Sequence, residues 1–164
     1  MADVAPLGQR LLEKARLAGV QIATAESCTG GMVAAAITDW AGSSAIFDRG
    51  FVTYANEAKQ EMLGVASTTL DAHGAVSEPV AREMAHCALK NSNATIAVSI
   101  TGIAGPGGSE FKPEGRVCFG LAADGRCQTE TIEFGALGRA EVRTKARDHA
   151  LELLLTACEH ALAK

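Results

Sequence analysis

The hydrophobic positions of this chain switch between two spacings along its length. Apolar residues that recur every three or four positions predict amphipathic helices over residues 6–19, 30–39, 77–90 and 139–163. Short apolar runs predict strands over residues 20–25, 45–54, 94–100, 117–123 and 127–134. Helices and strands that alternate in this way predict an α/β fold, a three-layer α/β/α sandwich with a mixed, mostly parallel sheet.

Polar residues and glycines mark where these elements begin and turn. Ser77 is followed directly by an acid and a proline, which predicts the start of a long helix. Asn56 is expected to be the N-cap of a short helix that runs through Leu63. Asp124 and Gly125 predict a tight turn that joins the last two strands in an antiparallel hairpin.

Length and composition are those of a globular protein with one domain, expected to span residues 1–164. Hydrophobic residues make up 48% of the chain and aromatic residues only 4%, so the core must be built from aliphatic side chains. The net charge is −4 without a block of like charges, which argues against nucleic acid as a partner. The apolar runs are shorter than the roughly 20 residues of a membrane helix, so no membrane partner is expected.

The cysteines and histidines show no spacing typical of a disulfide framework or a metal site. The five cysteines include no C-x-x-C pair, and the histidines no H-E-x-x-H arrangement. Met1–Pro6 lacks the basic and apolar regions of a signal peptide. We therefore expect reduced thiols and a cytoplasmic location. The oligomeric state stays open, a homo-oligomer included.

Three loops are expected at the carboxyl ends of the strands, where ligands bind in open α/β sheets: Ala25–Gly31, Tyr54–Lys59 and Thr101–Gly108. The glycines of the third loop let a ligand approach the backbone closely. Ser99 and Thr101 end the buried strand, and we expect them to face opposite sides, so that only one of them reaches a site.

The first loop places Ser27, Cys28 and Thr29 just before a helix that begins with Gly30 and Gly31. Amides at a helix N-terminus bind anions and can stabilise an oxyanion, so Ser27 could be a nucleophile or could bind a phosphate. Equally, Ser27 or Thr29 could merely cap the helix. Cys28 is a rival nucleophile because a thiol pKa falls at a helix N-terminus.

Lys59 in the second loop would lie in the first turn of the helix that Asn56 opens. The helix dipole disfavours positive charge there and lowers the pKa, as a general base requires, although most lysines are solvated surface residues. Tyr54, the only tyrosine, could stack on a ring or be an ordinary strand residue. Since no G-x-S-x-G elbow is present, a serine–lysine pair with Ser27 is the most economical nucleophilic arrangement.

Arg139 and Arg143 are four apart near the start of the last helix, and so they share a face. Two arginines in a first turn are unfavourable for the helix, and a bound phosphate would explain them. A solvated face that pairs with nearby acids explains them equally well.

Four segments in this order resemble one known family, that of the CinA C-terminal domain: TAESCTGG (24–31), GFVTYANEAK (50–59), GAVSEP (74–79) and SITGIAGP (99–106). The resemblance covers nearly the whole chain, from about Leu7 to about Leu155. It implies hydrolysis of the carboxamide of nicotinamide mononucleotide (NMN) to nicotinic acid mononucleotide and ammonia, in pyridine-nucleotide recycling. It implies no metal or organic cofactor, and NMN as the small-molecule partner.

The resemblance also implies roles for individual residues. Ser27 would be the nucleophile and Lys59 the base. Tyr54, Thr101 and the amides of Thr29, Gly30 and Gly31 would bind the substrate, and Arg143 would hold its phosphate. The spacing argument leaves Arg139 as the other candidate for the phosphate. Two alternatives stay open, an amidase that uses Cys28 and a nucleotide-binding module without turnover.

Overall fold

The computed structural model describes residues 5–109 and 111–164. Its strands are β1 Ile22–Glu26, β2 Phe47–Val52, β3 Ile96–Gly102, β4 Arg116–Ala123 and β5 Arg126–Glu133. Its α-helices are α1 Leu7–Ala18, α2 Met32–Thr38, α3 Asn56–Ala58, α4 Ser67–His73, α5 Glu78–Lys90 and α6 Arg139–Leu162. Two short turns of other types are a 3-10 helix, η1 Ser43–Ala45, and a π-helix, η2 Lys59–Leu63.

Within the described residues, the five strands form one sheet in the order β2-β1-β3-β4-β5. β1 pairs in parallel with both β2 and β3, whereas β4 pairs antiparallel with β3 and β5. β4 therefore runs against the direction of its neighbours, and the sheet is mixed, as predicted. The predicted hairpin joins β4 to β5, with Asp124 and Gly125 at φ 55° and 72° in its turn.

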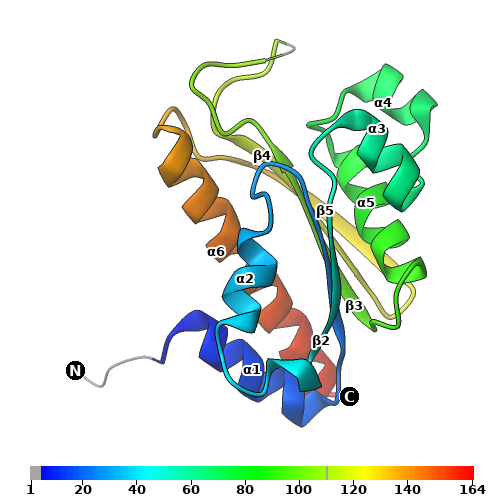
Figure 1. The fold of residues 1–164 in the computed structure, drawn as a ribbon, viewed down its shortest axis with the longest axis vertical. Helices are drawn as coiled ribbons and strands as arrows, with labels where there is room; N and C mark the ends of the chain where they lie inside the picture. Colours follow the sequence, from blue (N-terminus) through cyan, green and yellow to red (C-terminus); the bar gives the residue numbers. More distant parts are fainter. Residues whose placement is uncertain (1–4, 110) are drawn as a thin grey trace.

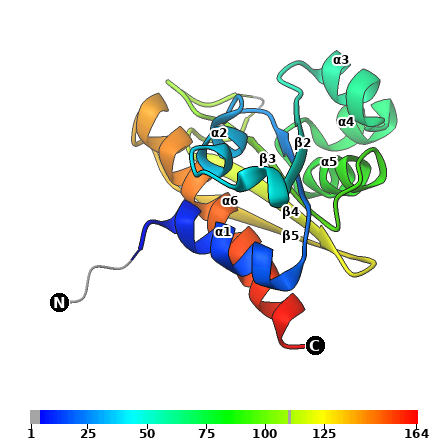
Figure 2. The same ribbon diagram turned by 60° about the horizontal axis from the view of Figure 1, so that its bottom comes forward.

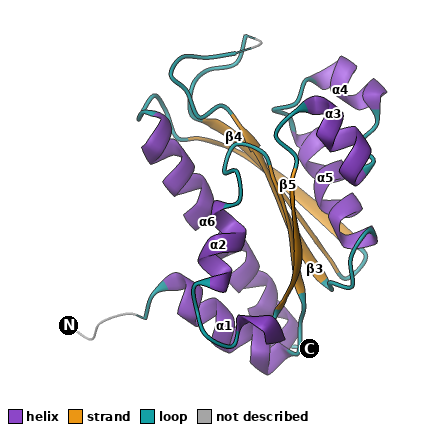
Figure 3. Cartoon of the chain, viewed as in Figure 1, coloured by secondary structure: helices purple, strands orange, loops and turns teal. Residues whose placement is uncertain are grey.

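Helices cover both faces of the sheet, which confirms the three-layer sandwich (Figure 1). α1, α2 and α6 pack on one face, and Figure 2 shows α1 lying beside α6. α5 covers the other face, with the shorter α3 and α4 beside it (Figure 3). Both faces of β1 and β3 are thus covered, and this explains why these strands are almost wholly buried.

The side chains of β1 point alternately into the two helical layers. Ile22 belongs to the apolar cluster beneath α1 and α6, whereas Ala23 and Ala25 belong to the cluster beneath α5. Neighbouring residues at the end of β1 consequently reach opposite sides of the sheet. This alternation decides where the side chains of Glu26 and Ser27 go.

The helix starts follow the sequence signals at one position and depart from them at another. Ser77 is the N-cap of α5, and its hydroxyl accepts a hydrogen bond from the Val80 amide at 3.4 Å, as expected for a cap. The prediction for Asn56 was wrong. Ala55 is the N-cap of α3, with an extended backbone at φ −80° and ψ 156°, and Asn56 is already helical.

No helix in the described ranges is both long and apolar enough to cross a membrane. The expectation that the chain starts without a signal peptide rests on Met1–Pro6, of which residues 1–4 lie outside the described part.

Candidate active site

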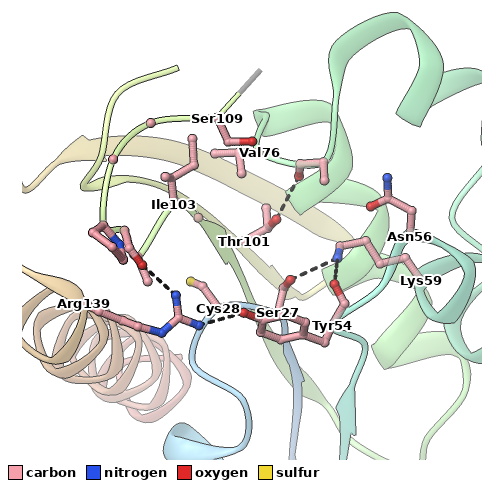
Figure 4. Close-up of a pocket in the computed structure, with 17 residues that line it drawn as sticks. Ser27, Cys28, Tyr54, Asn56, Lys59, Val76, Thr101, Ile103, Ser109 and Arg139 are labelled. Atoms are coloured by element: carbon pink, nitrogen blue, oxygen red, sulfur yellow. Dashed lines mark hydrogen bonds between the residues drawn. The ribbon is translucent and has the colours of Figure 1, made fainter. Parts of the chain in front are cut away.

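A pocket of about 310 Å³ lies at the carboxyl ends of β1 and β3 (Figure 4). All three predicted loops contribute to it, together with the first residue of α6. Its lining includes Ser27, Cys28, Tyr54, Asn56, Lys59, Ala75, Val76, residues 101–109 and Arg139. In the described part of the chain, no group of three or more His, Cys, Asp or Glu side chains could hold a metal ion. The chemistry therefore has to be argued from the polar groups of the pocket.

Ser27 and Lys59 meet inside this pocket. Lys59 Nζ lies 3.0 Å from Ser27 Oγ, 2.9 Å from the Thr53 carbonyl oxygen and 3.2 Å from that of Tyr54. A neutral amine has two hydrogens and one lone pair. The two carbonyl oxygens can accept both hydrogens, which leaves the lone pair facing the Ser27 hydroxyl. This is the geometry that a general base needs to take a proton from a nucleophile.

The charged form of Lys59 is disfavoured at this place. Its side chain is only 1% exposed, and burial lowers the pKa of the ammonium group below its ordinary 10.5. The predicted direction of the shift is confirmed, but the main cause is burial and not the helix dipole. Lys59 begins the π-helical turn η2 instead of lying in the first turn of a helix capped by Asn56.

The π-helical turn holds Lys59 against the sheet. The amides of Gly64 and Val65 both donate to the Lys59 carbonyl oxygen, each at 3.1 Å, and Gly64 ends the turn at φ 97°. Leu63, at the other end of η2, is buried in the apolar cluster beneath α5. The burial of Leu63 turns the same face of η2, and with it Lys59, toward the protein interior. Isolated π-helical turns occur often at functional sites.

The helix N-terminus after Ser27 is already occupied by a side chain of the protein. Glu26 accepts hydrogen bonds from the amides of Gly31, Val33 and Ala34 at 3.2, 2.9 and 3.0 Å. The Gly30 amide donates to the Ser27 carbonyl oxygen at 3.0 Å. The structure thus does not bring the amides of Gly30 and Gly31 to the pocket.

One amide of this loop stays available to the pocket. The Cys28 and Thr29 amides have no acceptor among the residues that the structure describes. Cys28 directly follows Ser27 and lines the pocket, so its amide could bind the oxyanion of an acyl-transfer intermediate, whereas Thr29 is fully buried and lies outside the lining.

Cys28 lines the pocket but is not an activated thiol. Burial raises its pKa to about 12, so the thiol is protonated at neutral pH. The lowered pKa expected at a helix N-terminus was wrong, because Glu26 takes the α2 amides and the side chain is 5% exposed. Lys59 is hydrogen-bonded to Ser27 and not to Cys28.

Arg139 bridges two loops at the pocket. Its guanidinium donates to the Gly105 carbonyl oxygen at 2.7 Å and to the Tyr54 hydroxyl at 2.8 Å (Figure 4). Tyr54 is 59% exposed, so its ring is accessible to a ligand. A cation and an aromatic ring therefore lie side by side at the edge of the pocket.

Arg143 lies behind the first loop instead. Its Nε donates to the Cys28 carbonyl oxygen at 3.0 Å and its Nη2 to that of Thr29 at 3.2 Å. Within the described residues, neither Arg143 nor Arg139 forms an ion pair, so the solvated face paired with acids is not observed. Of the two arginines, Arg139 is the one that lines the pocket.

Ser99 and Thr101 share one face of β3. Ser99 Oγ donates to the Ala81 carbonyl oxygen at 2.6 Å, and Thr101 Oγ1 donates to that of Ala75 at 2.8 Å. The prediction that they face opposite sides was wrong, because residues two apart in a strand point the same way. Thr101 lines the pocket, and its hydroxyl, which already donates, keeps lone pairs to accept a hydrogen bond.

The sequence argument did not single out three further lining residues. Asn56 contributes a side-chain amide next to Lys59, and Val76 and Ile103 contribute apolar surface (Figure 4). Asn56 was taken for a helix cap. Val76 and Ile103 lie within the segments that resemble the family, which is the signal that could have found them.

Comparisons with known proteins show the family to which this chain belongs. The family described as the CinA C-terminal domain matches residues 4–158. Nicotinamide-nucleotide amidohydrolase PncC of Escherichia coli K12 is 52% identical over 155 residues, which cover 93% of each protein. A relative from Symbiobacterium thermophilum, named a competence-damage inducible protein, is 50% identical over 157 residues. That match covers 90% of this chain but 36% of the longer relative.

A solved structure extends the likeness to three dimensions. The crystal structure of a competence/damage inducible protein from Agrobacterium tumefaciens superimposes with a TM-score of 0.89 at 46% identity. The match covers 94% of this chain and 98% of that one. The chain belongs to the CinA C-terminal domain family.

Proposed function

We propose that this chain, as one domain spanning residues 1–164, hydrolyses the carboxamide of NMN to nicotinic acid mononucleotide and ammonia in pyridine-nucleotide recycling. The observation that carries the proposal is the 3.0 Å contact between Lys59 Nζ and Ser27 Oγ inside the pocket. The names of relatives such as the E. coli amidohydrolase support the choice of substrate. The free thiols of the described cysteines suit the cytoplasm as its location.

The first half of the reaction forms an acyl-enzyme. Neutral Lys59 takes the proton of the Ser27 hydroxyl while Ser27 Oγ attacks the carboxamide carbon. The tetrahedral intermediate then collapses as its carbon–nitrogen bond breaks. The leaving nitrogen takes the proton from Lys59 and departs as ammonia.

The second half releases the acid. Water enters where ammonia left, Lys59 takes one of its protons, and the oxygen attacks the ester carbon. The bond to Ser27 Oγ breaks, and Lys59 returns the proton to the serine. The product is nicotinic acid mononucleotide, whose new carboxyl group gives up its remaining proton to solvent or to the released ammonia, and the protein needs no metal or organic cofactor in this scheme.

The amide of Cys28 stabilises the oxyanion in this proposal. It adjoins the nucleophile, its residue lines the pocket, and it has no acceptor in the described part of the protein. Donors placed in advance at a developing negative charge are often the largest contribution to such catalysis. Thr101 is not assigned this role because its hydroxyl donates to Ala75.

The rest of the pocket suits a mononucleotide. Arg139 binds the phosphate, since a guanidinium pairs well with phosphate oxygens and this one lines the pocket. Val76 and Ile103 give apolar surface for the pyridine ring, and Tyr54 is placed to stack or to donate a hydrogen bond. Arg143 is the less favoured phosphate ligand because its guanidinium already donates hydrogen bonds to two carbonyl oxygens.

An ammonia-release assay on NMN, nicotinamide and NAD, side by side, tests the proposal. We expect turnover of NMN by the wild-type protein and a loss of at least about 10³-fold in kcat for Ser27→Ala and for Lys59→Met. Circular dichroism confirms that each variant is folded. Retained activity in either variant would overturn the serine–lysine mechanism.

The same assay separates the enzyme from a nucleotide-binding module. If NMN raises the melting temperature of the wild-type protein while no ammonia forms, the protein binds NMN without turnover. The buried base beside Ser27 favours the enzyme, since a binding module gains nothing from a lysine with a lowered pKa.

A further inference from the structure

Glu26 is a buried carboxylate next to the proposed nucleophile. Its side chain is 0% exposed, and its two oxygens accept hydrogen bonds from the amides of Gly31, Val33 and Ala34. In the described part of the chain, no cation forms an ion pair with it. Burying a carboxylate is costly, and a neutral serine or threonine would cap a helix at lower cost. The charge therefore points to a role beyond capping α2.

The contact to Gly31 closes the loop that carries Ser27. Residues 27–30 lie between Glu26 and the Gly31 amide that its side chain binds at 3.2 Å. Inside this ring the Gly30 amide donates to the Ser27 carbonyl oxygen at 3.0 Å, and the Ser27 amide donates to Ile100 at 2.9 Å. The backbone of Ser27 is thus held on both sides. The direction of its hydroxyl toward the lysine depends on that backbone.

Arg143 binds the same loop by its carbonyl oxygens, at Cys28 and Thr29. The Cys28 carbonyl and the Thr29 amide belong to the same trans peptide bond. Its C=O and N–H point in opposite directions, so the Thr29 amide points away from Arg143. Glu26 accepts hydrogen bonds from the amides of Gly31, Val33 and Ala34. Arg143 donates hydrogen bonds to the loop's carbonyl oxygens that precede them in the chain. The amides that these two side chains leave without an acceptor, among the described residues of the loop, are those of Cys28 and Thr29.

We propose that Glu26 is a positioning residue for the amidohydrolase reaction. By closing the loop on itself, it holds Ser27 against Lys59 and keeps the Cys28 amide turned to the oxyanion. The inference rests on the proposed function. Glu26 does not line the pocket, so its effect passes through the loop. It should therefore act on kcat and leave substrate binding unchanged.

Glu26→Gln is the direct test, since glutamine has the same shape but replaces one acceptor oxygen by an NH₂ group that cannot accept. We expect kcat for NMN to fall about 100-fold while KM stays within about twofold, as for small misplacements of reacting groups. The pH at which the rate is half-maximal should not move, because Lys59 keeps its contacts. All rates are measured well below the melting temperature of the variant.

Glu83→Gln is the matched control. Glu83 accepts a hydrogen bond from the Ala66 amide at 2.9 Å at the start of α4, and it does not line the pocket. It should lose stability without losing kcat. The Gly31 and Val33 amides share one oxygen of Glu26, and the glutamine oxygen could take its place. Wild-type kcat in both a folded Glu26→Gln and a folded Glu26→Asp variant would therefore show that Glu26 is only a cap and would overturn the inference.

Two further measurements separate a failure of this inference from a failure of the proposed function or of folding. If Glu26→Gln does not fold, Glu26→Asp decides, because it keeps the charge but shortens its reach. A kcat at least about 10-fold lower supports the inference, and wild-type kcat overturns it. A wild-type protein that releases no ammonia overturns the function and this inference with it. An active wild type and an inactive Ser27→Ala, with unaffected Glu26 variants, overturn this inference alone.

Discussion

At the scale of single residues, the site depends on a lysine that the fold prefers to keep neutral. Lys59 is nearly inaccessible to water, and its two hydrogens have carbonyl acceptors at Thr53 and Tyr54. The neutral amine is the form that can take the proton of Ser27. The same burial that lowers the pKa of Lys59 raises that of Cys28, because the charged form of each is the one that burial penalises.

The rate of NMN hydrolysis should rise with pH as Lys59 loses its proton. Because burial lowers the pKa of Lys59, the midpoint of this rise should lie below the ordinary lysine value of 10.5. A profile of kcat/KM against pH measures it. A profile that falls with rising pH would contradict the role of Lys59 as base.

Cys28→Ala should keep kcat within about fivefold of the wild-type value, because a thiol protonated at neutral pH cannot be the nucleophile. Its pKa of about 12 also predicts slow alkylation by iodoacetamide at pH 7. Ammonia release and mass spectrometry measure the two effects. An inactive Cys28→Ala variant beside an active Ser27→Ala variant would favour the cysteine mechanism.

At the scale of elements, helices and strands with a buried apolar face could be predicted from the sequence. Elements that only their backbone hydrogen bonds distinguish could not. β3 and α5 follow from a continuous apolar run and from the cap signal at Ser77. The π-helical turn η2 has no period of its own in the sequence, so the burial of Lys59 was not predicted and its lowered pKa was attributed to the helix dipole. The contacts of Glu26 could not be predicted because its partners are backbone amides, which almost every residue type carries.

The packing of α5 on β4 depends on Gly120. A methyl group there would lie 2.5 Å from the Ala81 carbonyl oxygen and 2.6 Å from Ser99 Oγ. Gly120→Ala should lower the free energy of unfolding by about 3 kcal/mol, measured by urea denaturation. Gly125→Ala is the control, because its methyl group meets nothing within 4 Å. It should lose only about 1 kcal/mol to the left-handed backbone, and an equal loss would contradict the close approach.

At the scale of the whole molecule, α6 connects the site to the body of the protein. It packs along α1 and beneath β3 and β4, and its first turns reach all three loops of the pocket. The shared face of Arg139 and Arg143 was predictable from their spacing. The sequence could not predict that Arg139 lines the pocket while Arg143 binds the loop behind it, because this depends on how α6 packs against the sheet.

Arg139→Gln should raise KM for NMN about 10- to 100-fold, the range expected for a lost hydrogen bond to a charged group. KM for nicotinamide riboside, which lacks the phosphate, should change little. Steady-state kinetics on both substrates measure the difference. Arg147→Gln on the same helix, which removes a pair with Asp148, is the control and should change neither KM. Equal effects of Arg139→Gln on both substrates would assign the phosphate elsewhere.

The alternation at the end of β1 has a consequence for how the protein can evolve. Ser27 meets its base in the layer of α5 and η2, whereas Glu26 is held by α2 in the opposite layer. Side chains that line the pocket without holding the nucleophile, such as Val76 and Ile103, can therefore vary without disturbing its support. Substitutions at Val76 or Ile103 should combine additively with substitutions at Glu26, so a family with this strand can acquire new amide substrates in small, independent steps.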